Sequence, residues 1–129
     1  MKADLSKFLL TATLSLGVFM FSSCEDQDYR RAAEMTGGDP ARGKVAIYQY
    51  GCASCHTIPG IKGARGLVGP PLNSMADRMY IGGVIPNTPE NMIRWLQNPQ
   101  EADRLTAMPN LGISDSDARD IAGYIYTLR

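Results

Sequence analysis

Two cysteines and the only histidine of the chain lie within five residues, in the segment CASCH at 52–56. Cysteine and histidine side chains form disulfides, bind metals and act in catalysis, so their clustering indicates chemistry. A thioredoxin-type disulfide belongs in a βαβ setting, and the sequence shows no strand pattern. A structural zinc site needs four ligands, and the segment after residue 38 has no other cysteine or histidine. A cysteine nucleophile with a histidine base is disfavoured too, because adjacent side chains on one turn point apart.

The same five residues match C-x-x-C-H, the pattern for attachment of a c-type haem. In this interpretation the thiols of Cys52 and Cys55, three residues apart on one turn, form thioethers with the two vinyl groups of the macrocycle. His56 then lies beneath the iron as its proximal ligand. The haem interpretation uses all three side chains, and it predicts one covalently attached haem c.

On the other face of the iron, the chain has no second histidine to offer, so methionine, lysine, water or no ligand at all remain. Methionine is a known second ligand of haem iron. Met92 lies in a predicted helix, whereas Met75 and Met79 follow the haem motif too closely to reach round the ring. Met108 lies in the loop TAMPNLG, which Pro109 stiffens. Met108 is therefore the predicted second iron ligand.

A helix is predicted directly before the haem motif and would position it. Asp39 is a typical N-cap and Pro40 suits the first helical position, whereas Gly51 ends the helix next to Cys52. The segment 57–71 that follows is dense in glycine and proline and is predicted to be a loop.

Two more helices are predicted farther along the chain. The first begins at Thr88 and ends before Pro99, and the second begins at Ser114, after which apolar residues repeat at helical spacing. Loops are predicted elsewhere, and only residues 72–80 could hold another short helix. The predicted fold is all-α, with loops at 81–87 and 100–113.

The first 23 residues have the layout of a secretory signal, with basic residues followed by an apolar stretch and small residues. The apolar stretch is shorter than the roughly 20 residues that span a bilayer. FSSC at 21–24 resembles the lipobox of bacterial lipoproteins, so Cys24 is predicted to carry a lipid that tethers the protein to a membrane. The polar residues after it are predicted to be flexible. The predicted domains are a lipoprotein-type signal peptide (1–23), a lipidated cysteine with a flexible tether (24–38) and a mono-haem domain (39–129).

Charge excludes one class of partner. The chain has 13 basic and 13 acidic residues, which gives it no net charge. Proteins that bind nucleic acid show a basic patch or an overall basic charge. No nucleic-acid partner is expected.

Four segments in order resemble the class I cytochromes c: CASCH, GPPL at 69–72, WLQNP at 95–99 with TAMP at 106–109, and the last helix with Tyr124. The resemblance covers about residues 39–129. It implies short helices and long loops wrapped around one haem, with the first and last helices crossing near Gly43 and Tyr124. It also implies roles for individual residues: the Pro70 carbonyl accepts the His56 N–H, Leu72 packs on the haem, Trp95 lines the distal pocket, Thr106 lies near a propionate and Met108 binds the iron.

The resemblance implies an electron-transfer protein and not an enzyme, because an iron bound by both His56 and Met108 has no open position for a small-molecule substrate. The segment 79–95 is similar to cytochrome c domains attached to, or feeding, bacterial haem–copper oxidases. The expected function is that of a membrane-anchored carrier on the periplasmic side of a bacterial membrane, between a quinol-oxidising complex and a terminal oxidase. Two alternatives stay open: a fixed cytochrome subunit of one respiratory complex, and a five-coordinate haem sensor or peroxidase.

Overall fold

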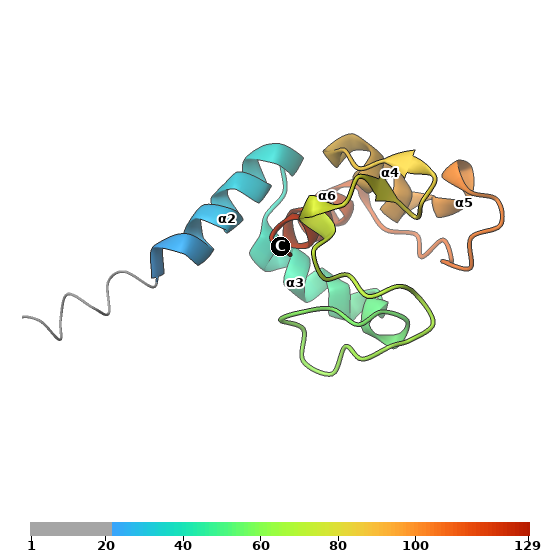
Figure 1. Ribbon diagram of the computed structural model, residues 1–129, viewed down its shortest axis with the longest axis horizontal. Helices are drawn as coiled ribbons and strands as arrows, with labels where there is room; N and C mark the ends of the chain where they lie inside the picture. Colours follow the sequence, from blue (N-terminus) through green and yellow to red (C-terminus); the bar gives the residue numbers. More distant parts are fainter. Residues whose placement is uncertain (1–21) are drawn as a thin grey trace, which may run out of the picture.

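The computed structural model describes residues 22–129, in which helices surround a central C-terminal helix (Figure 1). Regular elements are short, and long irregular segments join them. In chain order they are α2 (Ser22–Thr36), α3 (Pro40–Gln49), the 3₁₀ turns η1 (Cys52–Ser54) and η2 (Met75–Asp77), β1 (Tyr80–Ile81), β2 (Ile85–Pro86), α4 (Pro89–Gln97), α5 (Pro99–Ala102) and α6 (Asp115–Tyr126).

The three helices predicted from the sequence are confirmed as α3, α4 and α6. The Asp39 carboxylate accepts hydrogen bonds from the backbone N–H groups of Ala41 and Arg42, as an N-cap should. Thr88 caps α4 and Ser114 caps α6 in the same way. The all-α fold class is confirmed as well, because the described residues add only a two-stranded sheet.

That small sheet and α5 occupy segments that were predicted to be loops. β1 and β2 pair antiparallel, with Ile81 opposite Ile85. Gly82 and Gly83 turn the chain between them with positive φ angles of 58° and 77°, which glycine adopts without a steric cost. Strands of two residues are too short to show an alternating pattern, and for this reason no strand was predicted there.

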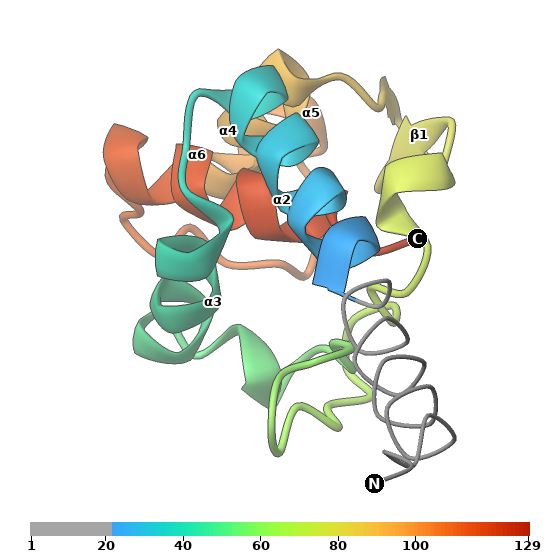
Figure 2. The same ribbon diagram turned by 90° about the vertical axis from the view of Figure 1, so that its left-hand side faces the viewer.

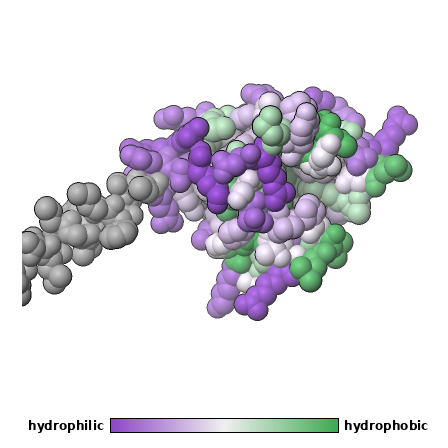
Figure 3. Space-filling view, viewed as in Figure 1, coloured by the Kyte–Doolittle hydropathy of each residue, from purple (hydrophilic) through white to green (hydrophobic). Residues whose placement is uncertain are grey.

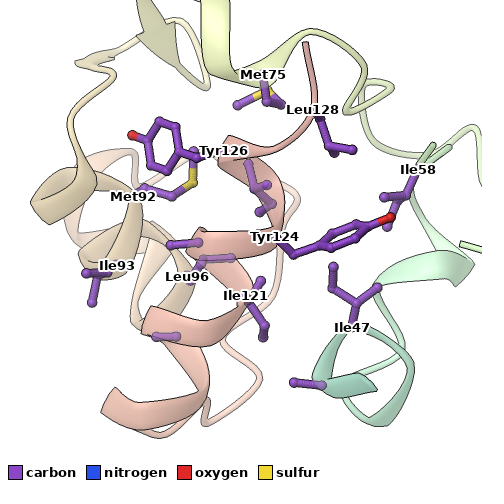
Figure 4. Packing of buried hydrophobic residues seen from close by; sticks show 14 of the residues in the cluster. Ile47, Ile58, Met75, Met92, Ile93, Leu96, Ile121, Tyr124, Tyr126 and Leu128 are labelled. Carbon is purple, nitrogen blue, oxygen red and sulfur yellow. The ribbon is translucent and has the colours of Figure 1, made fainter. Parts of the chain in front are cut away.

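Helix α6 forms the centre of the core, with α3 on one side and α4 on another. Met92 and Leu96 of α4 lie against one side of α6, and Ile47 of α3 lies near its other side (Figure 4). At the crossing of α3 and α6, a Cβ added to Gly43 would lie only 1.9 Å from the Asp120 carbonyl oxygen. The expected crossing near Gly43 is confirmed, and only glycine allows the two backbones to approach this closely.

The prediction of a flexible tether over residues 24–38 is wrong, because most of this segment belongs to α2, which packs on α6. Ala32 is fully buried and Thr36 is 2 % exposed. The segment is polar in composition, and its buried stripe of Ala32, Thr36 and the half-buried Tyr29 contains no large aliphatic residue. The predicted signal peptide at 1–23 lies, up to residue 21, outside the described residues. Within residues 22–129 no helix is long and apolar enough to cross a membrane.

The Asp120 carboxylate stabilises the crossing of α3 and α6 through hydrogen bonds and an ion pair. Its side chain is 7 % exposed. It accepts hydrogen bonds from the Asp39 backbone N–H at 2.6 Å and from the Arg42 guanidinium at 2.7 and 3.0 Å. Burial raises the pKa of the Asp120 carboxyl, but these hydrogen bonds and the Arg42 charge outweigh burial and hold the pKa below its ordinary value.

We therefore expect Asp120→Asn to destabilise the protein at neutral pH by on the order of 1 kcal/mol, because a charge-assisted acceptor is lost. A carboxyl with a lowered folded-state pKa stabilises the fold above its unfolded pKa of roughly 4, and this contribution disappears as pH falls through the folded value. The difference between wild type and variant should shrink in acid. Urea unfolding at several pH values measures it. Asp115→Asn is the control, since Asp115 pairs with Arg119 on an exposed face, and an equal loss in both variants would contradict the prediction.

Candidate haem-binding site

One cavity of about 660 Å³ brings together all eight residues that the sequence assigned to a cofactor. Its volume lies within the roughly 300–1,000 Å³ that small-molecule and cofactor sites occupy. Its walls come from the haem-motif turn, the loop after it, α4, α6 and the loop between α5 and α6. The eight residues are Cys52, Cys55, His56, Pro70, Leu72, Trp95, Thr106 and Met108.

The haem motif forms a single tight turn at the end of α3. Gly51 adopts a positive φ of 69° and redirects the chain, after which the N–H groups of Cys55 and His56 both donate to the Cys52 carbonyl, at 3.2 and 3.0 Å. This turn places both thiols on the cavity wall. Cys52 and Cys55 do not form a disulfide, so both are available for bonds to a macrocycle.

The competing chemistries for the motif fit this geometry less well. Burial raises the pKa of the Cys52 thiol, whereas a nucleophilic cysteine needs a lowered pKa. Among residues 22–129 no three histidine, cysteine, aspartate or glutamate side chains are arranged to hold a metal ion. The zinc and nucleophile interpretations therefore have no support in the arrangement of these side chains.

The His56 ring is fixed by the loop at 69–72. Its Nδ1 atom lies 2.7 Å from the Pro70 carbonyl oxygen, so the hydrogen bond that the resemblance implied is present. Two backbone hydrogen bonds hold the loop in place, from Gly69 to the Cys55 carbonyl and from Leu72 to the Thr57 carbonyl. With Nδ1–H donated to a carbonyl, the Nε2 atom carries the lone pair that a metal ion needs.

Gly69 is required for this contact, because a Cβ atom there would lie 2.4 Å from the His56 Cε1 atom. We expect Gly69→Ala to displace the ring and to cost about 1–3 kcal/mol, the usual range for overpacking. For a domain of this size, that is a decrease in Tm of at least roughly 4 °C. Thermal unfolding of the holoprotein measures it, with Pro71→Ala at the neighbouring exposed position as control. Equal Tm values for the two variants would contradict the expected clash.

The loop that carries Met108 is fastened at two points. The Met108 backbone N–H donates to the Thr106 hydroxyl at 3.3 Å, and its carbonyl accepts from the Gln100 side chain at 2.7 Å. Thr106 thus stabilises the Met108 loop as well as lining the cavity. Met108 itself is half-buried and packs against the core.

Two other methionines line the cavity, which the reasoning from the sequence did not expect. Met75 of η2 and Met92 of α4 are 6 % and 2 % exposed, and both form part of its wall. They are core residues of short elements whose packing brings them to the cavity. Met79 is 78 % exposed and is not among the lining residues. Three methionines thus line the cavity, and of these three Met108 alone lies on a loop.

Trp95 and Arg78 shape the rest of the wall. The Trp95 ring packs on Gly82, where a Cβ would lie 2.7 Å from a ring carbon, so the absence of a side chain at Gly82 makes room for this contact. The Arg78 guanidinium donates to the carbonyls of Pro71 and Asn73 at 2.6 and 2.9 Å and braces the loop that holds His56. The Trp95 contact joins α4 to the hairpin, whereas the Arg78 contacts reach back only five and seven residues along the chain.

The donor set fits a haem. The residues lining the cavity are mostly apolar, and none of those within the described range is acidic, as suits a flat apolar macrocycle. Cys52 and Cys55 would hold its edge by thioether bonds, His56 would supply an imidazole to the iron and Met108 a thioether sulfur.

Comparisons with known proteins agree with this site. The family model described as Cytochrome c matches residues 40–129. A curated relative, cytochrome c oxidase subunit 2 of Alkalihalophilus pseudofirmus, is 26 % identical over 89 residues, which cover 68 % of this chain and 25 % of that protein. The chain thus spans about a quarter of the relative's length. No solved structure matches.

Proposed function

The chain belongs to the cytochrome c family, and from this premise we propose that it is a mono-haem electron carrier tethered to a membrane through Cys24. Haem c binding and electron transfer follow from the family. The observation that supports a mono-haem carrier is one cavity lined by Cys52, Cys55, His56 and Met108. One such set of side chains provides for one covalent haem.

Each of these residues has a defined task. Bound haem supplies one-electron chemistry, in which iron alternates between Fe(II) and Fe(III). Cys52 and Cys55 fix the position of the macrocycle, and the hydrogen bond to Pro70 holds the His56 ring in one orientation. Met108 would supply a sulfur ligand to the iron, which would raise the reduction potential and leave no position for a substrate. Fixed ligands change little between the two oxidation states, and this favours rapid electron exchange.

An enzyme is the weaker candidate. A haem peroxidase or a gas sensor needs an open iron position, and a peroxidase also needs an acid–base group beside it. The described residues that line the cavity include no carboxylate and no histidine other than His56. This lining favours electron transfer.

The proposed partners are a quinol-oxidising complex as donor and a terminal oxidase as acceptor, on the periplasmic side of a bacterial membrane. The similarity to part of an oxidase subunit supports the acceptor, and FSSC at 21–24 supports the export and the anchor. The same similarity favours a second candidate, a cytochrome that is a fixed subunit of one respiratory complex.

Redox kinetics in membranes test the proposal. The full-length holoprotein, reconstituted with membranes that contain both complexes, should be reduced when quinol is added and reoxidised when oxygen is admitted. Absence of either step, or turnover of hydrogen peroxide at comparable rates, would contradict a carrier. Recovery from mild detergent in a fixed ratio with an oxidase would favour the fixed subunit.

A further inference from the structure

Helix α2 precedes the part of the chain that matches the cytochrome c family, which begins at residue 40. It nevertheless packs on α6, in front of which it lies in Figure 2. The helix connects the proposed lipid attachment point to the haem domain. The rigidity of its attachment to the haem domain therefore decides which orientations the domain can adopt relative to a membrane.

The C-terminal end of α2 is interlocked with α6. The Thr36 hydroxyl accepts from the Gly38 backbone N–H, and the Thr36 carbonyl accepts from the Arg119 guanidinium at 3.3 Å. A Cβ added to Gly38 would lie 2.3 Å from the Arg119 backbone, and one added to Gly123 would lie 3.2 Å from the Thr36 hydroxyl oxygen. The two segments touch with no room for larger side chains.

The N-terminal half of α2 is attached as well. The Arg129 guanidinium lies 3.4 Å from the Asp28 carboxylate and 3.6 Å from that of Asp77, so it joins α2 to the chain end and to η2. Tyr29 is half-buried, and burial raises the pKa of its hydroxyl. Together with the fully buried Ala32, these contacts fix the helix from Asp28 to Thr36.

Helix α2 and the haem cavity lie on opposite faces of α6. Ile121 and Ile125 of α6 line the cavity, whereas Gly123 faces Thr36 of α2. Residues two apart on a helix lie about 160° apart around its axis. The end of the molecule that carries α2 is also the more hydrophilic one, and strongly hydrophobic side chains lie toward the other end (Figure 3).

Exposed apolar side chains flank the cavity on the loops that line it. Leu67 is 90 % exposed next to the lining residue Val68, and Leu105 is 93 % exposed next to the lining residue Thr106. Exposed apolar side chains at a site rim are typical of protein contact surfaces. The loop between α5 and α6, which carries Leu105, lies at the end of the molecule away from α2 (Figure 1).

We propose that α2 is a rigid strut that turns the haem cavity and its apolar rim away from the lipid anchor, toward a partner domain that projects from the membrane. This inference rests on the proposed anchor at Cys24. Twelve residues separate Cys24 from Thr36, a helical length of about 18 Å. A flexible segment would have a similar average reach, but it would let the cavity approach the bilayer in any orientation.

The test uses the lipidated holoprotein on phospholipid vesicles that carry a fluorescent headgroup, whose emission haem quenches at short range. Ala32→Glu places a charge at a fully buried position, and Met35→Glu is the matched control at a position that is 42 % exposed. Wild type and Met35→Glu should quench weakly and equally, whereas Ala32→Glu should quench several-fold more. Arg129→Gln, which removes the attachment to Asp28, is a milder second variant and should give an intermediate value.

Hydrogen exchange and mass spectrometry separate the possible failures. Amides at 28–36 should exchange slowly in wild type and rapidly in Ala32→Glu, while the visible spectrum of the haem stays the same. Rapid exchange in wild type, or equal quenching in wild type and Ala32→Glu, would contradict the proposal that α2 is a rigid strut. Neither result would contradict the proposed lipid anchor at Cys24. If mass spectrometry found the N-terminal peptide without a lipid, it would contradict the proposed anchor at Cys24. The proposed role of α2 as a strut would then be contradicted as well.

Discussion

Replacing Cys52 and Cys55 together by alanine should abolish covalent haem attachment and remove most of the folded holoprotein. The two thiols lie on the cavity wall and neither has a disulfide partner. The cavity of about 660 Å³ is walled by core residues such as Ile47 and Ile121. Without a bound macrocycle these apolar walls face water, and a ligand that binds only the folded state no longer stabilises it.

Haem staining of the denatured protein and thermal unfolding measure the two effects. Staining should fall at least tenfold, and the remaining protein should unfold at a lower temperature than wild type. Cys24→Ser is the matched control, because it removes the remaining cysteine of the chain and leaves the haem motif intact. Its staining should equal that of wild type. A double variant that keeps its spectrum and its stability would refute covalent attachment at this motif.

The second large effect is expected from Met108→Ala, which should open one position on the iron. The reduction potential should fall by on the order of 0.1 V or more, a part of the roughly 0.8 V range that axial ligands set. The reduced variant should also bind carbon monoxide, which the wild type should exclude. Potentiometric titration and absorbance spectra with and without the gas measure these changes.

The other methionines at the cavity provide the controls for this assignment. Met75 and Met92 line the same cavity, so Met75→Leu and Met92→Leu keep its volume nearly constant while removing one sulfur each. Both should retain the wild-type potential and exclude carbon monoxide. If Met92→Leu produced the fall in potential and Met108→Ala did not, the assignment of Met108 as the ligand would be wrong.

Local signals in the sequence were sufficient for three helices and for the haem motif. Asp39-Pro40 and Thr88-Pro89 carry their own start signals, because capping depends on residues only two or three positions apart. The cysteines and histidine of CASCH also lie within one turn. These features depend on neighbours along the chain, and the structure has them where the sequence placed them.

Features that depend on distant contacts were harder to predict. The segment of α2 was expected to be flexible because it is polar and ends in a glycine pair, and only the contact with α6 shows why Ala32 is buried. Met75 was set aside because it follows the motif closely along the chain, and Met92 because it lies in a predicted helix. In the structure the packing of η2 and α4 brings both to the cavity. The resemblance to a known family, and not periodicity, supplied the contact between His56 and Pro70.

The central claim is that His56 and Met108 hold one iron between them. X-ray absorption at the iron edge of the purified full-length protein tests this claim most directly, because it detects an iron–sulfur bond. The account predicts a single sulfur neighbour in the wild type that is lost in Met108→Ala and kept in Met92→Leu. An iron without a sulfur neighbour in the wild type, or a sulfur signal that survives in Met108→Ala, would contradict it.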